Sequence, residues 1–178
     1  HRRAQHRHGA AVADPDRALA SLARLQQDAP KQLSALLKKQ FGLTRLLRIL
    51  GGSKGLAEFV VRHPSSLNIF ARTPSLPGDQ EQLRKVLCDA VAPVKGVASL
   101  AGDAGRDALR IRYRELLTQI ALYDLSVETP QDHIDEVTGA LSDIAGGALE
   151  AALCVARAEV AETFPAEDVA LVDLAIIG

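Results

Sequence analysis

Three arginines in one short segment are the residues whose type and spacing point most directly to chemistry. Arg110 and Arg114 lie one helical turn apart on one face, whereas Arg112 points well away from them. Guanidinium groups bind phosphate and carboxylate groups through forked N–H donors, so these arginines are candidate contacts to a phosphate or to a neighbouring acidic element. The alternative is a solvated helix face on which Arg112 and Glu115 form an i,i+3 ion pair.

Two glycine-rich segments contain the residue types of nucleotide-binding loops without their order. Residues 51–55 (GGSKG) follow a segment that is helical in pattern, whereas a Walker A loop needs G-x-x-x-x-G-K-[ST] after a strand. Residues 102–106 (GDAGR) resemble half of a dinucleotide-binding fingerprint, again with no strand before them. Both segments are interpreted as turns.

The histidines and cysteines show no catalytic or metal-ligand spacing. Cys88 and Cys154 are far apart in the sequence, which predicts reduced thiols buried in a core. His63 and His133 lie at a helix end and a helix start, where structural or exposed roles are expected. The histidine-rich residues 1–12 could bind a metal, but a disordered leader is the interpretation we prefer. No metal site is predicted.

The composition favours a mainly helical protein. Of the 178 residues, 47% are hydrophobic but only 3% are aromatic, so the core must consist of Leu, Ala, Val and Ile. The net charge of −1 provides no overall attraction to nucleic acid or to an anionic membrane. No apolar run as long as a membrane span and no signal peptide is recognised, so a cytoplasmic location is expected.

Helix start and stop signals position the candidate residues. Asp14-Pro15, Ser53 and Thr129-Pro130 each predict a helix start, and the arginines lie in a helix predicted over 106–123. The helix after Pro130 is the longest predicted, and its Gly146-Gly147 pair indicates either a kink or another backbone packed against it. Residues 73–78 form the clearest loop.

The last ten residues, 169–178, form a β-branched apolar run that predicts a buried strand. A lone strand leaves its backbone groups unpaired, so either a sheet follows Gly178 or the run is a helix. We favour a sheet that follows. Together with the absence of a methionine before His1, this indicates that both ends of the chain are cut.

Four segments in order resemble the bifunctional glutamine synthetase adenylyltransferase/adenylyl-removing enzymes. Residues 47–64 (LRILGGSKGLAEFVVRHP) are similar to a stretch of that family that ends in arginine-histidine-proline. Residues 109–125 (LRIRYRELLTQIALYDL) are similar to its R-x-x-x-R-E-L-L helix, with Ile111 and Tyr113 as departures that weaken a phosphate-binding role for this face. Residues 137–153 (VTGALSDIAGGALEAAL) resemble the long helix that follows, and 173–178 (DLAIIG) the first strand of the catalytic core.

The resemblance implies a parent enzyme that attaches AMP from ATP to a tyrosine of glutamine synthetase and removes it by phosphorolysis. This segment would belong to the amino-terminal, AMP-removing unit. A pair of aspartates holds Mg²⁺ in such enzymes, and these would lie beyond Gly178, so the fragment alone is predicted to be inactive. ATP or phosphate and Mg²⁺ are the implied cofactors. Glutamine synthetase is the implied partner, together with a nitrogen-regulatory PII-type signalling protein.

The chain is expected to divide into three parts. Composition and loop signals predict a leader over residues 1–12 and a helical bundle-like region over 13–168, with the loop at 71–79 as a candidate sub-boundary. The resemblance makes 169–178 the first strand of a truncated nucleotidyltransferase core. Gly178 would start the phosphate-facing turn, and Arg110, Arg112 and Arg114 remain candidate contacts to ligand or partner. The alternative function is a free-standing helical interaction or scaffold module without enzymatic activity.

Overall fold

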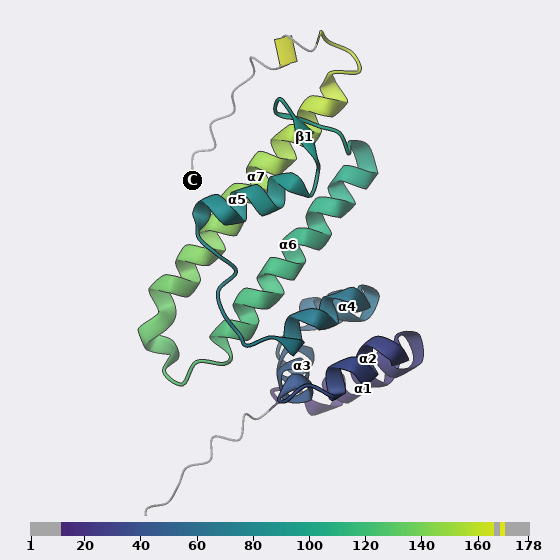
Figure 1. The fold of residues 1–178 in the computed structure, drawn as a ribbon, viewed down its shortest axis with the longest axis vertical. Coiled ribbons are helices and arrows are strands. Elements are labelled where there is room, and N and C mark those ends of the chain that lie inside the picture. The colour runs from purple at the N-terminus through teal and green to yellow at the C-terminus, as the bar shows by residue number, and fades with distance from the viewer. Residues whose placement is uncertain (1–11, 166–167, 170–178) are drawn as a thin grey trace, which may run out of the picture. The chain divides into compact units, whose positions relative to one another are not determined.

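The fold is mainly α-helical, as the composition predicts, and comprises two compact units (Figure 1). The computed structural model describes residues 12–165 and 168–169. Unit 1 contains the described residues up to Pro74 together with residues 121–126, and unit 2 contains residues 75–120 and the described residues from Val127 onward. The expected leader up to residue 11 and all but the first residue of the expected strand at 169–178 lie outside the described residues.

Unit 1 is built from short helices separated by proline and glycine. Its elements are α1 (Pro15–Asp28), α2 (Pro30–Leu37), α3 (Gly42–Gly52), α4 (Lys54–Arg62) and a 3₁₀ helix, η1 (Pro64–Ala71). Two of the expected caps are confirmed: the Asp14 carboxylate accepts a hydrogen bond from the Arg17 amide at 2.9 Å, and the Ser53 hydroxyl accepts one from the Leu56 amide at 3.4 Å. The helix expected to end before Pro64 does so.

Aliphatic and aromatic side chains from all these helices form the core of unit 1. The members with the lowest exposure are Leu25, Leu33, Leu46, Ile49, Leu50, Val60 and Phe70. Hydrogen bonds from Arg17 connect α1 to α3, since its guanidinium donates to the carbonyls of Leu50 and Gly51 at the end of α3. These carbonyls have no partner within their own helix, so the bond replaces a C-terminal cap.

Residues 121–126 are joined to α3 by a second arginine. The Arg48 guanidinium donates to the carbonyl of Leu125 at 2.9 Å, and the Leu125 side chain lies beside Gly52. Leu122 in the same segment is 1% exposed. Unit 1 therefore depends on a segment that follows it in the chain by many residues.

Unit 2 combines three helices with a small hairpin. Its elements are α5 (Gln80–Asp89), β1 (Pro93–Val94), β2 (Val97–Ala98), most of α6 (Gly102–Asp124), a 3₁₀ helix η2 (Pro130–His133) and α7 (Ile134–Val160). The long helices α6 and α7 run in opposite directions (Figure 1), and the side chains of Arg106 and Glu159 form an ion pair between them. The α5 start is closed by a capping box in which Asp79 and Gln82 bond each other's backbone amides.

The hairpin of β1 and β2 was not predicted from the sequence. β1 and β2 pair antiparallel, with Pro93 opposite Ala98 and Val94 opposite Val97. The two loop residues, Lys95 and Gly96, have φ values of 51° and 78°, as a two-residue type I′ turn requires. Each strand has only two residues, too few for an alternating pattern to be recognised in the sequence.

Two helix starts differ from those expected. α6 begins at Gly102 rather than at Arg106, because the Gly105 amide already donates to the Ala101 carbonyl at 3.2 Å; Gly102 itself has φ 59°, outside the right-handed helical region. Thr129 makes no side-chain cap, and a 3₁₀ turn over Pro130–His133 precedes α7. Near the C-terminus, Asp168 and Val169 form a helical turn. Of the strand expected over 169–178, only Val169 is described.

The Gly146-Gly147 pair marks a close approach of two helices. A Cβ on Gly147 would lie 3.0 Å from the Arg84 Cα and 2.9 Å from the Leu87 Cδ1, so α5 packs directly on α7 at this point. Figure 1 shows α5 lying against α7. A Cβ on Gly146 would meet nothing within 4 Å. The core around this contact comprises Leu83, Leu87, Val91, Leu116, Ile120, Ile144 and Val155, with smaller residues.

The α7 helix also corrects an expectation about membranes. The helix Pro130–Val160 is, by length and composition, apolar enough to cross a membrane, contrary to the reading that no such run exists. Its apolar side chains include Ile144, Ala151 and Val155, which are buried in the core of unit 2. A buried core helix of a globular protein has the same composition, so this feature is weak evidence for a membrane span.

The two adjacent glycines provide a matched test of this packing. We expect Gly146→Ala to raise the free energy of unfolding by up to about 1 kcal/mol, because alanine favours the helix and the site is open. Gly147→Ala should lower it by about 1–3 kcal/mol, because the added methyl group overpacks the contact with α5. Urea unfolding followed by circular dichroism measures both, and shifts of the same sign would contradict the close approach.

Candidate functional site

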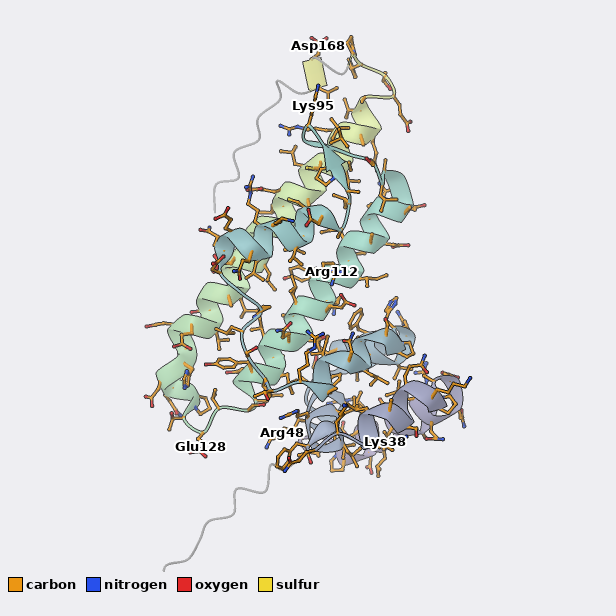
Figure 2. The ribbon with its side chains drawn as sticks, viewed as in Figure 1. Lys38, Arg48, Lys95, Arg112, Glu128 and Asp168 are labelled. Atoms are coloured by element: carbon orange, nitrogen blue, oxygen red, sulfur yellow. The ribbon has the colours of Figure 1, made fainter. Side chains whose placement is uncertain are left out.

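The three candidate arginines do not form a cluster. Arg112 pairs with Glu115 at 2.8 Å, which confirms the ion pair expected from the sequence, and Arg110 pairs with Asp107 at 3.1 Å. Both pairs are exposed and lie within α6, where Figure 2 labels Arg112. The Arg114 side chain is exposed, and within the described part of the chain its guanidinium has no ion pair. Of the three, Arg114 alone retains an uncompensated charge.

The glycine-rich segment at 51–55 is a structural turn, as interpreted from the sequence. Gly51, next to the last residue of α3, is in close contact with the chain before α1, since a Cβ there would lie 3.0 Å from the Asp14 carbonyl oxygen. Its own carbonyl accepts a hydrogen bond from Arg17. A nucleotide-binding loop binds phosphate through backbone N–H groups. Here the Ser53 amide donates to the Ile49 carbonyl and the Leu56 amide to the Ser53 hydroxyl, so both are used within the turn. Gly102 likewise opens α6, and Gly178 lies outside the described residues.

A cleft in unit 2 brings together groups that the sequence separates. It has a volume of about 690 Å³ and lies between α5, α7 and the hairpin. Its polar walls consist of paired charges: Arg84 of α5 with Glu150 of α7, and Lys85 with Asp89 at 2.6 Å. The hydrogen bond that Arg84 donates to the Glu150 carboxylate raises the pKa of Arg84, and the one that Lys85 donates to the Asp89 carboxylate raises the pKa of Lys85.

Both cysteines line this cleft. Both are free thiols, as predicted from the sequence. Cys154 on α7 is buried, as expected, whereas Cys88 on α5 is only half-buried. Burial is the main cause that raises the pKa of each thiol. A raised pKa reduces the thiolate fraction at neutral pH, so neither sulfur is activated as a nucleophile.

The cleft was not predicted from the sequence, although a signal for it exists. Arg84 and Cys88 are four residues apart on α5, and Glu150 and Cys154 are four residues apart on α7. Each pair therefore shares one helix face, and the two faces meet in the cleft. Only the contact between α5 and α7 shows that these faces belong together.

The described residues offer little to a metal ion. Within 12–165 and 168–169, no group of three or more His, Cys, Asp or Glu side chains is close enough to hold one. His63 stacks near Phe59 with ring centroids 5.0 Å apart, and His133 contacts Glu136 at 3.1 Å at the start of α7. These contacts are local, as expected for histidines at helix ends.

Comparison with known proteins finds relatives of this chain that are much longer proteins. No family model matches it, and no solved structure does. It is 42% identical over 172 residues, 94% of its length, to a bifunctional glutamine synthetase adenylyltransferase/adenylyl-removing enzyme of Leifsonia xyli. It is 35% identical over 154 residues to the enzyme of that name from Cutibacterium acnes, and 30% identical over 173 residues to that from Mycobacterium tuberculosis.

These matches cover 94%, 82% and 93% of the chain but only 17%, 15% and 17% of the relatives, respectively. The chain is thus homologous to one mainly helical segment of much longer proteins. Through that segment it belongs to the family of bifunctional glutamine synthetase adenylyltransferase/adenylyl-removing enzymes, which confirms the resemblance seen in the sequence.

The two thiols should react slowly in the folded protein. At neutral pH we expect a disulfide reagent such as DTNB to modify Cys88 before Cys154, and both much faster once urea unfolds the chain, because burial raises both pKa values. The rate of modification should still rise with pH at values where an exposed thiol is already fully ionised and its own rate has levelled off. Cys88→Ser and Cys154→Ser assign the two phases. Equal rates in native and unfolded protein would contradict the burial of both sulfurs.

Proposed function

We propose that the chain is the helical part of the AMP-removing unit of an enzyme that adenylylates and deadenylylates glutamine synthetase. The observation that carries this proposal is the identity along 94% of the chain to a relative that bears this name. In this proposal the chain supplies scaffold and docking surface, in the cytoplasm, while the chemistry occurs in the part of the relatives that the chain does not match. A PII-type protein would be a regulatory partner of the whole enzyme.

The described residues support a division between scaffold and catalysis. Transfer of an adenylyl group needs carboxylates that hold Mg²⁺ against the phosphates. Among the described residues, no group of three or more His, Cys, Asp or Glu side chains is close enough to hold a metal ion. When bound to the whole enzyme, Mg²⁺ would neutralise phosphate charge for attack by phosphate or tyrosine. No residue described here is assigned to that step.

The proposal predicts that activity needs the longer protein. The 178-residue chain, folded by circular dichroism, should release no ADP from adenylylated glutamine synthetase supplied with phosphate and Mg²⁺, and should transfer no AMP from ATP. The full-length product of the same gene should at least release ADP from adenylylated glutamine synthetase. Turnover by the purified chain would overturn the proposed inactivity. A full-length product without either activity would favour the alternative, a helical interaction module.

Arg114 is the arginine of α6 that we propose as a contact to glutamine synthetase. In the full-length enzyme, Arg114→Ala should raise KM for adenylylated glutamine synthetase by about tenfold, because one charge-assisted hydrogen bond is lost. Arg112→Ala is the matched control, since Arg112 is paired with Glu115 on its own helix and should have a much smaller effect. Equal effects, or a change in kcat alone, would exclude this role.

A further inference from the structure

The charge of the chain is distributed very unevenly. The described residues of unit 1 contain ten Lys and Arg but five Asp and Glu, whereas those of unit 2 contain eight Lys and Arg and fifteen Asp and Glu. Between residues 29 and 78 the only acidic residue is Glu58, against eight Lys and Arg. The net charge of −1 conceals this difference. Unit 1 therefore has a positive surface that attracts acidic groups.

An apolar groove opens on this positive surface, between α2 and η1. It has a volume of about 250 Å³. Its walls are mainly aliphatic and come from Ala35, Leu36, Pro64, Leu67 and Ala71. Lys39 is the only charged residue in its lining. Cofactor and drug-sized ligand pockets have volumes of roughly 300–1,000 Å³, so this groove suits a protruding apolar side chain better.

The loop beside the groove exposes a strained aromatic residue. Phe41 has φ 62°, in the left-handed region that a non-glycine residue adopts at a cost of about 1–2 kcal/mol, and its side chain is 59% exposed. The Arg45 guanidinium lies 5.9 Å from its ring centroid and donates to the Arg72 carbonyl at 2.8 Å. Burial does not compensate this strain, since most of the ring faces solvent.

The neighbouring charges are available to a partner. Lys38, labelled in Figure 2, caps α2, and Lys39 follows it; both are exposed. No ion pair with an acidic side chain is found for either lysine among the described residues. We define the α2–η1 groove as the groove lining together with Lys38, Phe41 and Arg45. It combines an apolar groove with positive side chains at its edge that form no ion pair with an acidic side chain among the described residues.

We propose that the α2–η1 groove binds an acidic segment of a partner protein that inserts an apolar side chain. The apolar groove binds the inserted side chain, and the lysines contact the acidic residues on either side of it in the partner segment. Phe41 becomes buried on binding, which it is not in the free protein. A nucleic-acid backbone would satisfy the charges but has no apolar group for the groove. A membrane would meet protruding residues but would not fill a hollow. This surface needs no enzymatic activity, so the inference is independent of the proposed function.

A defined peptide tests the proposal on the intact 178-residue chain. The probe is a fluorescein-labelled amphipathic helical peptide of Glu, Ala and Leu, with its leucines on one face, and fluorescence anisotropy measures its binding. A peptide of the same composition with scattered leucines, and one with Lys in place of Glu, are the ligand controls. We expect the amphipathic acidic peptide to bind, the scattered one to bind at least about tenfold more weakly, and the Lys peptide not to bind.

Matched variants locate the binding surface. Lys39→Glu should weaken binding by about tenfold or more, whereas Lys54→Glu, the same change at an exposed residue outside the groove lining, should weaken it by less than about threefold. Phe41→Asn should weaken binding while leaving the melting temperature equal or higher, because asparagine tolerates the left-handed conformation. That combination separates loss of a contact from loss of the fold.

The remaining outcomes overturn the proposal. Equal weakening by Lys39→Glu and Lys54→Glu would show a general charge effect without a groove. Equal affinity for the two acidic peptides would remove the apolar anchor. Binding only to vesicles of phosphatidylcholine and phosphatidylserine would assign the surface to a membrane. Self-association in sedimentation experiments that Lys39→Glu abolishes, with no peptide binding, would assign it to a second copy of the chain.

Discussion

The contact between α5 and α7 at Gly147 is the constraint on which unit 2 depends. Only a glycine allows the backbone of α5 at Arg84 to approach α7 this closely. A glycine within a helix costs about 1 kcal/mol relative to alanine, and the burial of Leu87 and Ile144 around the contact offsets this cost. The same approach brings the Arg84 and Glu150 side chains into an ion pair and places both cysteines in one cleft. The geometry of the cleft is thus a consequence of helix packing.

The separation of charge gives the two units different surface properties. In unit 1 some arginines connect segments through hydrogen bonds as well as adding surface charge. Arg17 and Arg48 both donate to backbone carbonyls at helix ends, which have no partner within the helix. Unit 2 uses its charges in ion pairs along and between helices, such as Arg106 with Asp103 and Glu159. Exposed pairs of this kind contribute little to stability but keep the surface solvated.

Much of the helical pattern was predictable because local signals determine it. The Asp14 and Ser53 caps, the break at His63-Pro64 and the Arg112–Glu115 pair involve residues no more than a few positions apart, so the sequence contains all the information needed. The hairpin was missed because its two-residue strands have no readable period. The left-handed Phe41 was unpredictable because the turn imposes a conformation that phenylalanine does not favour.

The candidate site could not be predicted in the same way. The cleft depends on the α5–α7 contact, which joins residues more than sixty positions apart, such as Arg84 and Glu150. Conversely, the arginines of α6 were candidates by type and spacing, and of their ion pairs only the one between Arg112 and Glu115 was anticipated from the sequence. Asp107 and Glu115, one turn away on the same helix, neutralise two of them.

The discontinuity of unit 1 has a consequence for the order in which the chain acquires its structure during synthesis. Residues 121–126 emerge from the ribosome only after residues 75–120 of unit 2. Until then Arg48 lacks the Leu125 carbonyl, and the place of Leu122 in unit 1 is empty. Domains that are contiguous in sequence can fold one by one as they are translated. Here the first unit remains incomplete until the C-terminal end of α6 has been made, so residues 75–120 of unit 2 must be synthesised before unit 1 can be completed.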